Sequence, residues 1–245
     1  MEVANASLYD GATATVEAIM MALRLQKKRS KIVIKPGINP EYKRVIEAYL
    51  ADHEDLTISS QLAELDEHTA CLIVQTPDYH GNPQKLKALR QLCDSKNILL
   101  IVVVTEILSL GLLPAPIEAD IVVGEGQSLG VNMNYGGPHL GFFAGKRAFV
   151  RQMPGRICGR AVDSNGKPGF VLTLNAREQH IRRQKATSNI CSNQGLNIVA
   201  FTAHLALLGK AGFKRLALLN HYRAKLLAEA LQASAGLVID QPYFN

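Results

Sequence analysis

The sequence contains few aromatic residues and no tryptophan: phenylalanine and tyrosine make up 6% of its 245 residues. It has no stripe of basic residues interleaved with aromatic ones and no zinc-finger or RNP-like motif, so we expect no nucleic-acid partner. The formal net charge of +6 is modest for this length. The only compact basic run, which is Lys27, Lys28, Arg29 and Lys31, is interpreted as a solvated helix end.

Cysteines and long apolar runs are also scarce. Four widely spaced cysteines form neither a Cys-x-x-Cys nor a Cys/His ligand pattern, which predicts reduced thiols and no metal site. No signal peptide is visible, and the longest continuous apolar run, residues 98–104, is far shorter than the ~20 residues that span a bilayer. We therefore expect a cytoplasmic protein with no membrane partner.

Apolar content of 47% and charged content of 20% are typical of a globular protein. Strands are expected over residues 32–35, 56–59, 71–76, 98–104, 120–123 and 140–145, and helices over 11–29, 40–49 and 84–93, with Asp10 as the first N-cap. This alternation predicts an open α/β sheet whose strands are mostly parallel. Ligands in such sheets bind at the carboxyl ends of the strands.

The second half of the chain has a different pattern. Residues 160–162 and 170–174 flank an Asn-Gly turn and predict a hairpin, and residues 196–210 and 213–233 predict two helices. We expect a large domain over residues 1–210 and the start of a smaller α+β domain over 211–245, with a strand-like segment at 236–240. Because a helix begins with no strand before it and the chain stops soon after a strand, we expect a fragment cut at both ends.

Residues 120–146 combine the layout of a cofactor-lysine loop with the absence of the lysine. An apolar strand runs into a Gly-rich loop, and a second strand follows Gly136, Gly137 and Pro138. In pyridoxal-phosphate enzymes of the aspartate-aminotransferase type, such a loop presents a His-Lys pair. Here those positions hold Gln127 and Ser128, and a serine hydroxyl cannot form an imine.

Three further segments bear on the same chemistry. Residues 74–81 join a strand end to a helix through Pro77, either as simple turn punctuation or as a place for a polar residue near a pyridoxal ring. Thr105 stands where catalytic relatives place an Asp for the pyridine nitrogen, and Glu106 is one residue out of register. In residues 182–194, Thr and Ser hydroxyls and backbone N–H groups lie beside Arg182, Arg183 and Lys185, which predicts either an anion site or a helix-capping loop.

Residues 5–14, 124–159 and 177–196 together closely resemble glycine decarboxylase, the P-protein of the glycine cleavage system, and in particular its N-terminal half, a separate subunit 1 in many bacteria. The resemblance implies the large-domain fold of the aspartate-aminotransferase type. It also implies that Ser128 replaces the Schiff-base lysine, so that no catalytic residue lies in this chain. Pyridoxal phosphate would then be bound by the catalytic subunit 2.

The resemblance further implies a role for the assembled enzyme, glycine dehydrogenase (aminomethyl-transferring, decarboxylating), an oxidoreductase of glycine catabolism. It would decarboxylate glycine and pass the aminomethyl group to the lipoyl arm of the H-protein, with this chain as an inactive, supporting subunit of a heteromer. Thr187, with Ser188 or Asn189, would complete the partner's phosphate site in trans, although Ala186 replaces the usual Gly.

Two alternatives stay open. One is a self-sufficient pyridoxal-phosphate enzyme that uses another lysine, such as Lys146 or Lys185. The other is a binding protein that retained a phosphate pocket after losing its chemistry.

Overall fold

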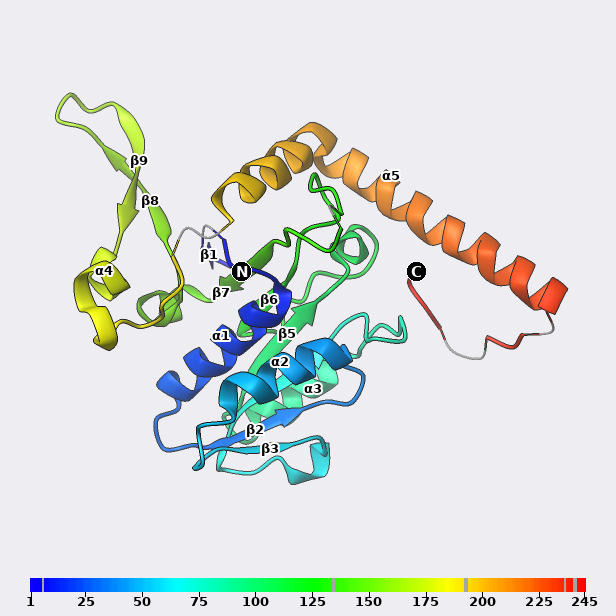
Figure 1. Cartoon of the computed structure of the whole chain (residues 1–245), viewed down its shortest axis with the longest axis horizontal. Coiled ribbons are helices and arrows are strands. Elements are labelled where there is room, and N and C mark those ends of the chain that lie inside the picture. Colours follow the sequence, from blue (N-terminus) through cyan, green and yellow to red (C-terminus); the bar gives the residue numbers. More distant parts are fainter. Residues whose placement is uncertain (6, 134, 192–193, 236, 240–241) are drawn as a thin grey trace.

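The computed structural model describes residues 1–5, 7–133, 135–191, 194–235, 237–239 and 242–245. A central sheet carries helices, with a hairpin and a long bent helix projecting from it (Figure 1). The sheet strands are β1 (Val3–Ala4), β2 (Lys31–Ile34), β3 (Thr57–Ser59), β4 (Thr69–Gln75), β5 (Leu99–Val104), β6 (Ile121–Glu125) and β7 (Gly141–Gly145). The helices beside it are α1 (Gly11–Leu25), α2 (Pro40–Leu50) and α3 (Leu86–Asp94).

The sheet has seven strands in the order β1-β7-β6-β5-β4-β2-β3. Neighbours from β3 to β6 pair in parallel, whereas β7 pairs antiparallel with β6 and with β1. The predicted open, mostly parallel sheet is confirmed. All residues of β4 and β5 are buried, as a sheet covered on both faces requires. The carboxyl ends of the parallel strands therefore share one edge.

Helix α1 begins where the sequence predicted, because Asp10 caps it. The Asp10 carboxylate accepts from the Thr13 N–H (2.7 Å). The Thr13 hydroxyl oxygen in turn accepts from the Asp10 N–H (3.3 Å), which completes a capping box. The helix ends at Leu25, four residues before the predicted end at Arg29. Its apolar face packs into the main core with Ile32, Ile101 and their neighbours.

The basic run after α1 is not simply a solvated helix end. Lys27 and Lys28 are exposed, but Arg29 donates to the Thr69 carbonyl (2.7 Å) and Lys31 forms an ion pair with Asp66 (2.6 Å). Half of the run is therefore used to hold the start of the sheet together.

The expectation that no strand precedes the first helix is wrong. Val3 and Ala4 form β1 and pair with Gly145 and Ala144 at the sheet edge. Two residues carry no readable periodicity, and their extended conformation comes from pairing with a strand about 140 residues later, so the local sequence could not indicate it.

The predicted hairpin is confirmed as β8 (Ile157–Val162) and β9 (Pro168–Thr173). The two predicted C-terminal helices form one bent element, α5 (Gly195–Ala235), broken at Gly209, where φ is 58° and ψ is −175°. Residues 237–239 form no strand, contrary to expectation, and residues 236 and 240 of that segment lie outside the described residues. The remaining elements are α4 (Gln179–Arg182) and the 3-10 turns η1 (Leu62–Glu64), η2 (Ile107–Gly111), η3 (Arg147–Gln152), η4 (Asn175–Arg177) and η5 (Arg183–Lys185).

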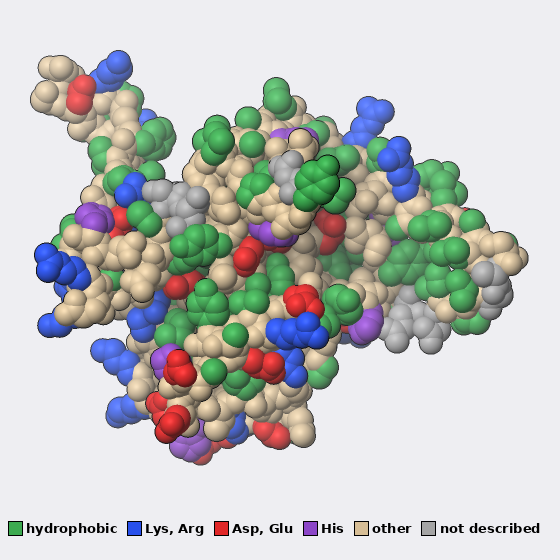
Figure 2. Space-filling view, in the orientation of Figure 1, with side chains coloured by type: hydrophobic (Ala, Val, Ile, Leu, Met, Phe, Trp, Pro, Cys, Tyr) green, Lys and Arg blue, Asp and Glu red, His purple; other side chains and the backbone are tan. Residues whose placement is uncertain are grey.

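Helix α5 leaves much apolar surface uncovered. Apolar side chains gather over its second half in Figure 2, and Tyr222 and Leu227 are 57% and 61% exposed. By length and composition the helix could cross a bilayer, and no residue of its most apolar 18-residue stretch is buried. A helix whose apolar face is covered by another protein surface has the same composition, so one such helix is weak support for a membrane span.

Candidate functional site

The edge formed by the carboxyl ends of the parallel strands contains Gln127 and Ser128 after β6 and Thr105 and Glu106 after β5. The loops after β4, β5 and β6 meet there beside the N-terminus of α1. In open α/β sheets this edge is where ligands bind. The geometry of each loop shows whether its polar groups are free to bind a ligand or are already bonded within the chain.

Gln127 and Ser128 lie in a turn directly after β6. Ser128 is exposed. The Gln127 N–H donates to Oε1 of Glu125 (3.0 Å), and its side-chain amide donates to the Pro138 carbonyl (3.1 Å). The pair predicted to replace His-Lys thus carries no amine, and Gln127 joins the two ends of the Gly-rich loop.

The ends of β4 and β5 are joined by a buried amide. Gln75, 4% exposed, accepts from the Asn39 N–H (2.7 Å) and donates to the Pro77 carbonyl (3.1 Å) and the Thr105 hydroxyl (3.0 Å). Each polar atom of the Gln75 side chain therefore has a partner within the chain. Gln75 lies in the segment 74–81 that the sequence analysis named, but its role in joining the ends of β4 and β5 was not predicted.

Glu106 does not substitute for the missing Asp. Its carboxylate accepts from the Leu108 N–H (2.9 Å), which caps η2, and from the Asn245 side chain (3.0 Å). β5 ends at Val104, so neither Thr105 nor Glu106 lies in the strand, and the position of the Glu106 carboxylate is set by the following turn and not by strand register.

The N-terminus of α1 receives a second carboxylate besides Asp10. The Gly11 N–H donates to Oε2 of Glu125 (3.1 Å), while Oε1 accepts from the N–H groups of Gln127 (3.0 Å) and Leu140 (2.8 Å). His139 lies 3.7 Å from the same carboxylate. Burial raises the pKa of Glu125, and the three N–H donors and His139 oppose that shift.

The predicted phosphate donors lie elsewhere, between two cavities near α4. A cavity of about 660 Å³ is lined by Ser188 and Asn189 together with Glu17 and Arg24, and Thr187 borders it. The Ser188 hydroxyl donates to Oε1 of Glu17 (2.8 Å) and accepts from the Ile190 N–H (3.0 Å). The Ser188 hydroxyl therefore already donates its proton to a carboxylate of the same chain.

Thr187 also borders a smaller, basic cavity of about 280 Å³. Its other lining residues include Arg151, Arg177 and Arg182. The Arg177 guanidinium donates to the carbonyls of Met153 and Gly155, which leaves Arg151 and Arg182 as its exposed cations. Lys and Arg side chains also surround α4 on the surface (Figure 2). Of the three predicted donors, Thr187 alone adjoins a basic cavity.

Glu17 and Arg24 were missed by the sequence analysis. Burial raises the pKa of Glu17, against the Ser188 hydrogen bond and the charge of Arg24, and burial lowers the pKa of Arg24. Oε2 of Glu17 and Nε of Arg24 are buried without a hydrogen-bond partner. A carboxylate that interrupts an apolar helical run was the signal available in the sequence.

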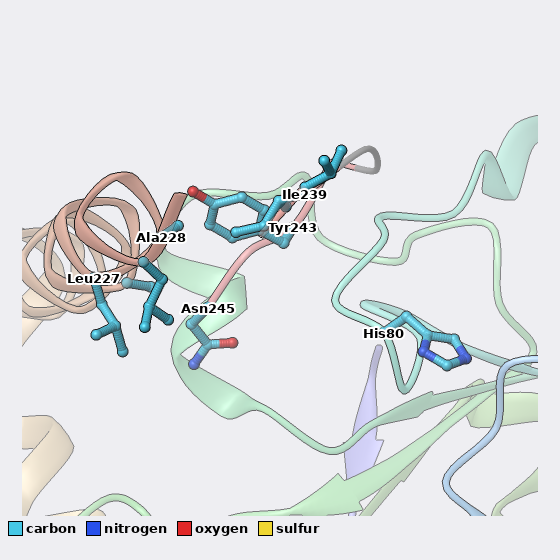
Figure 3. Close-up of a pocket in the computed structure, with 9 residues that line it drawn as sticks. His80, Leu227, Ala228, Ile239, Tyr243 and Asn245 are labelled. Carbon is cyan, nitrogen blue, oxygen red and sulfur yellow. The ribbon is translucent and has the colours of Figure 1, made fainter. Parts of the chain in front are cut away.

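A further cavity of about 500 Å³ lies between α5 and the C-terminal residues. Leu227 and Ala228 of α5 lie on one side of it and Ile239 and Tyr243 on another, with His80 in the loop after β4 (Figure 3). Its lining is predominantly apolar, with no convergent set of polar groups. Among the described residues, no group of three or more His, Cys, Asp or Glu side chains is placed to hold a metal ion.

The family model of the glycine cleavage system P-protein matches residues 1–245. This chain belongs to the P-protein family. It is 54% identical to a probable glycine dehydrogenase (decarboxylating) subunit 1 of Rhodospirillum centenum, spanning 100% of this chain and 57% of that protein. A subunit of the same name from Beijerinckia indica is 50% identical over the same shares of each protein. The chain therefore spans little more than half the length of these relatives.

Solved structures agree with this assignment. An inhibitor-bound crystal structure of glycine decarboxylase (P-protein) superposes with a TM-score of 0.94 at 40% identity, covering 100% of this chain and 58% of that one. A transaminase with PLP bound shares the fold, with a TM-score of 0.60 at 19% identity over 96% of this chain and 56% of that one. The predicted fold of the pyridoxal-phosphate transferase type is confirmed.

The residues at the carboxyl edge do not fit pyridoxal phosphate. No lysine stands in the loop after β6, and Thr105 carries no charge for a pyridine nitrogen. At the start of α1, Glu125 occupies the Gly11 N–H and Asp10 occupies the Thr13 N–H, which a phosphate would need. Lys146 is at the opposite edge of the sheet, paired with the buried Asp120, and Lys185 is exposed in η5. Neither lysine named in the alternative hypothesis reaches the edge where ligands bind.

Proposed function

We propose that this chain is part of the non-catalytic subunit 1 of glycine decarboxylase and supports catalysis by a partner subunit. The observation that carries the proposal is Ser128, an exposed hydroxyl in the turn after β6 where a catalytic relative would carry its lysine. The neighbouring strand ends are joined by internal hydrogen bonds of Gln75 and Glu125, which leaves no amine and no open anion site there.

The need for a partner is supported by the surface of the chain. It exposes 13956 Å², whereas a folded monomer of its 26.7 kDa exposes about 10,700 Å². The excess is comparable in size to the surface that permanent complexes bury. The projecting hairpin and α5 contribute exposed apolar side chains to this surface, such as Phe170 (80% exposed) and Leu227 (61%).

In the proposed assembly, a cytoplasmic catalytic subunit 2 binds pyridoxal phosphate, which serves as the electron sink for loss of CO₂ from glycine. The aminomethyl group then passes to the lipoyl arm of the H-protein. This chain covers the partner's active-site face, and Thr187, between the basic cavity and the Glu17 cavity, donates to the partner's cofactor phosphate. Ser188 orients that turn, because its hydroxyl already bonds Glu17, and Asn189 in the lining of the Glu17 cavity is the second candidate donor.

The test is an absorbance spectrum of the purified chain with pyridoxal phosphate, alone and mixed with the catalytic subunit, followed by glycine-dependent CO₂ exchange. We expect no imine band from the chain alone and exchange activity only in the mixture. An imine band from the chain alone would overturn the proposal, and Lys146→Ala and Lys185→Ala would then identify the lysine. Full activity of the catalytic subunit without this chain would also overturn it.

A further inference from the structure

Backbone N–H groups at the start of α1 and in the loop after β6 form an anion site, and the carboxylate of Glu125 occupies it. Three backbone N–H groups, from Gly11, Gln127 and Leu140, converge on its carboxylate at 2.8–3.1 Å. The side chain is 16% exposed, and His139 lies 3.7 Å away on its outer side. The Gln127 donor belongs to the turn that follows Glu125, but the Leu140 and Gly11 donors lie 15 and 114 positions away, so the contact is not only a local turn.

The position of this carboxylate is the place where a phosphate would bind. Gly11 is the first residue of α1, a 15-residue helix whose N-terminus faces the carboxyl end of β6. Free N–H groups at such an end, together with the helix dipole, attract phosphate groups. Here the Gly11 N–H bonds Glu125 and the Thr13 N–H bonds Asp10, so that two carboxylates of the chain occupy the helix end.

Close backbone packing leaves little room for a ligand beside Glu125. A Cβ added to Gly11 would lie 2.1 Å from the Tyr42 hydroxyl, and one added to Gly141 would lie 2.3 Å from the Asp10 carbonyl. A Cβ on Gly124 would lie 1.9 Å from the Val104 carbonyl. A Cβ on Gly11 would also lie 2.9 Å from the carbonyl carbon of Gly124, so Gly11 and Gly141 let the start of α1 rest on the ends of β6 and β7. While the Glu125 side chain is present, this packing leaves no space for a phosphate group.

We propose that Glu125 is a built-in substitute for a cofactor phosphate, and that it excludes pyridoxal phosphate and other phosphate esters from this chain independently of the missing lysine. Restoring a lysine at position 128 therefore does not restore cofactor binding while Glu125 is present. A second negative charge at the same N–H groups would be repelled by the carboxylate already there. The inference concerns this chain alone and does not depend on a partner subunit.

Glu125→Ala tests the proposal by anion rescue. Removing the carboxylate leaves three N–H groups without acceptors and is expected to destabilise the chain. Inorganic phosphate or pyridoxal phosphate should then raise its thermal midpoint in a saturable manner. We expect the variant to bind phosphate at least about tenfold more tightly than the wild-type chain, for which no saturable shift is expected. Binding is read independently from the ³¹P resonance of the added phosphate.

Glu106→Ala is the matched control. Glu106 also follows a neighbouring strand, β5, and accepts a backbone N–H, from Leu108, but it caps the five-residue turn η2 rather than a full helix. Its loss should not create saturable phosphate binding. If Glu125→Ala does not fold, Glu125→Ser serves instead, because a hydroxyl retains one acceptor and still leaves space for an anion.

Two results would overturn the proposal: saturable stabilisation of the wild-type chain by phosphate, or a Glu125 variant that responds to phosphate no more than Glu106→Ala does. The lysine arm is a separate check. Ser128→Lys alone should give no imine band with pyridoxal phosphate, and an imine band from it would contradict exclusion by Glu125. Because none of these readouts uses the catalytic subunit, they can fail while the subunit-mixing experiment succeeds, and the reverse.

Discussion

Asp120 links three segments through one buried carboxylate. It forms ion pairs with Arg90 (2.6 Å) and Lys146, and it accepts from the Leu100 N–H (2.8 Å), with its side chain 7% exposed. Asp120→Ala removes the buried carboxylate beside Arg90 and Lys146 at the amino edge of the sheet, and it leaves Arg90 only the exposed Asp94 as a partner (2.9 Å). We expect the free energy of unfolding to fall by about 3 kcal/mol, measured by urea denaturation.

The control for this change is Glu47→Ala. Glu47 pairs with Lys43 at 3.7 Å on the exposed face of α2, with both side chains about half exposed. Surface pairs of this kind contribute about 0–1 kcal/mol. Equal losses from Asp120→Ala and Glu47→Ala would contradict a structural role for the buried cluster.

Glu17 gives the chain a defined pH dependence. Because burial raises its pKa above the usual value of 4.5, the native state retains a proton that the unfolded chain releases. The contribution of Glu17 to the free energy of unfolding therefore declines as pH rises from about 4.5 through the folded pKa. Glu17→Gln cannot ionise, so its stability relative to wild type should grow over this interval.

The measurement is urea denaturation of both proteins at a series of pH values above 4.5. Ser188→Ala is the companion variant, because the Ser188 hydrogen bond lowers the Glu17 pKa. Loss of this hydrogen bond should raise the Glu17 pKa further, so that the decline in the free energy of unfolding extends to higher pH. Parallel stability profiles for wild type and Glu17→Gln would show that Glu17 does not titrate in this way.

Thr187 is the remaining donor candidate in the turn after η5. In the mixture with the catalytic subunit, Thr187→Ala is expected to weaken the apparent affinity for pyridoxal phosphate about tenfold, the effect of losing one hydrogen bond to a charged group. Titration of CO₂ exchange with the cofactor measures it. Thr202→Ala is the control, because the Thr202 hydroxyl only bonds the carbonyl of Ile198 within α5. An unchanged affinity in Thr187→Ala would remove this residue from the phosphate site.

At the scale of elements, the bend in α5 lies at one glycine. Gly209 has φ 58° and ψ −175°, a conformation that other residues adopt only at a cost of about 1–3 kcal/mol. Gly209→Ala should therefore lower the free energy of unfolding by that amount or straighten the helix, which changes the packing of Phe201 and Leu205 on the core. Urea denaturation and hydrogen exchange of α5 measure the two effects.

Gly212→Ala is the matched control three residues away. Gly212 has ordinary helical geometry, and an added Cβ would lie 3.3 Å from Leu208 Cβ in the same helix. Alanine in place of a helical glycine contributes up to about 1 kcal/mol of stability, which the close contact with Leu208 offsets in part. If both variants behave alike, the backbone of Gly209 is not what bends α5.

The elements that could be predicted from the sequence are those with their own periodicity or capping. The buried run of β5, the Asp10 cap of α1 and the Asn-Gly turn of the hairpin all carry a local signal. The role of Glu125 could not be predicted, because its Gly11 donor lies 114 positions away and only the folded sheet brings them together. Ser128 could be predicted as part of a degenerate loop because a missing amine is visible in sequence alone.

At the scale of the whole molecule, the hairpin projects from the body (Figure 1), and apart from Ile157 at its base none of its strand residues is buried. Phe170, Val171 and Leu172 are 80%, 50% and 44% exposed. A two-stranded hairpin is at best marginally stable by itself in water, and exposed apolar groups of this size mark protein interfaces. If the proposed partner subunit covers it, the hairpin gains stability from assembly.

Phe170→Asp tests this arrangement. We expect association with the catalytic subunit to weaken about tenfold or more, as loss of a buried aromatic contact does. The isolated chain should change by less than about 0.5 kcal/mol, because Phe170 has few contacts to lose there. Ser164→Asp adds the same charge at the exposed hairpin tip without removing apolar surface. Binding calorimetry of both variants separates the effects: equal weakening indicates charge repulsion, and wild-type affinity for Phe170→Asp places the hairpin outside the interface.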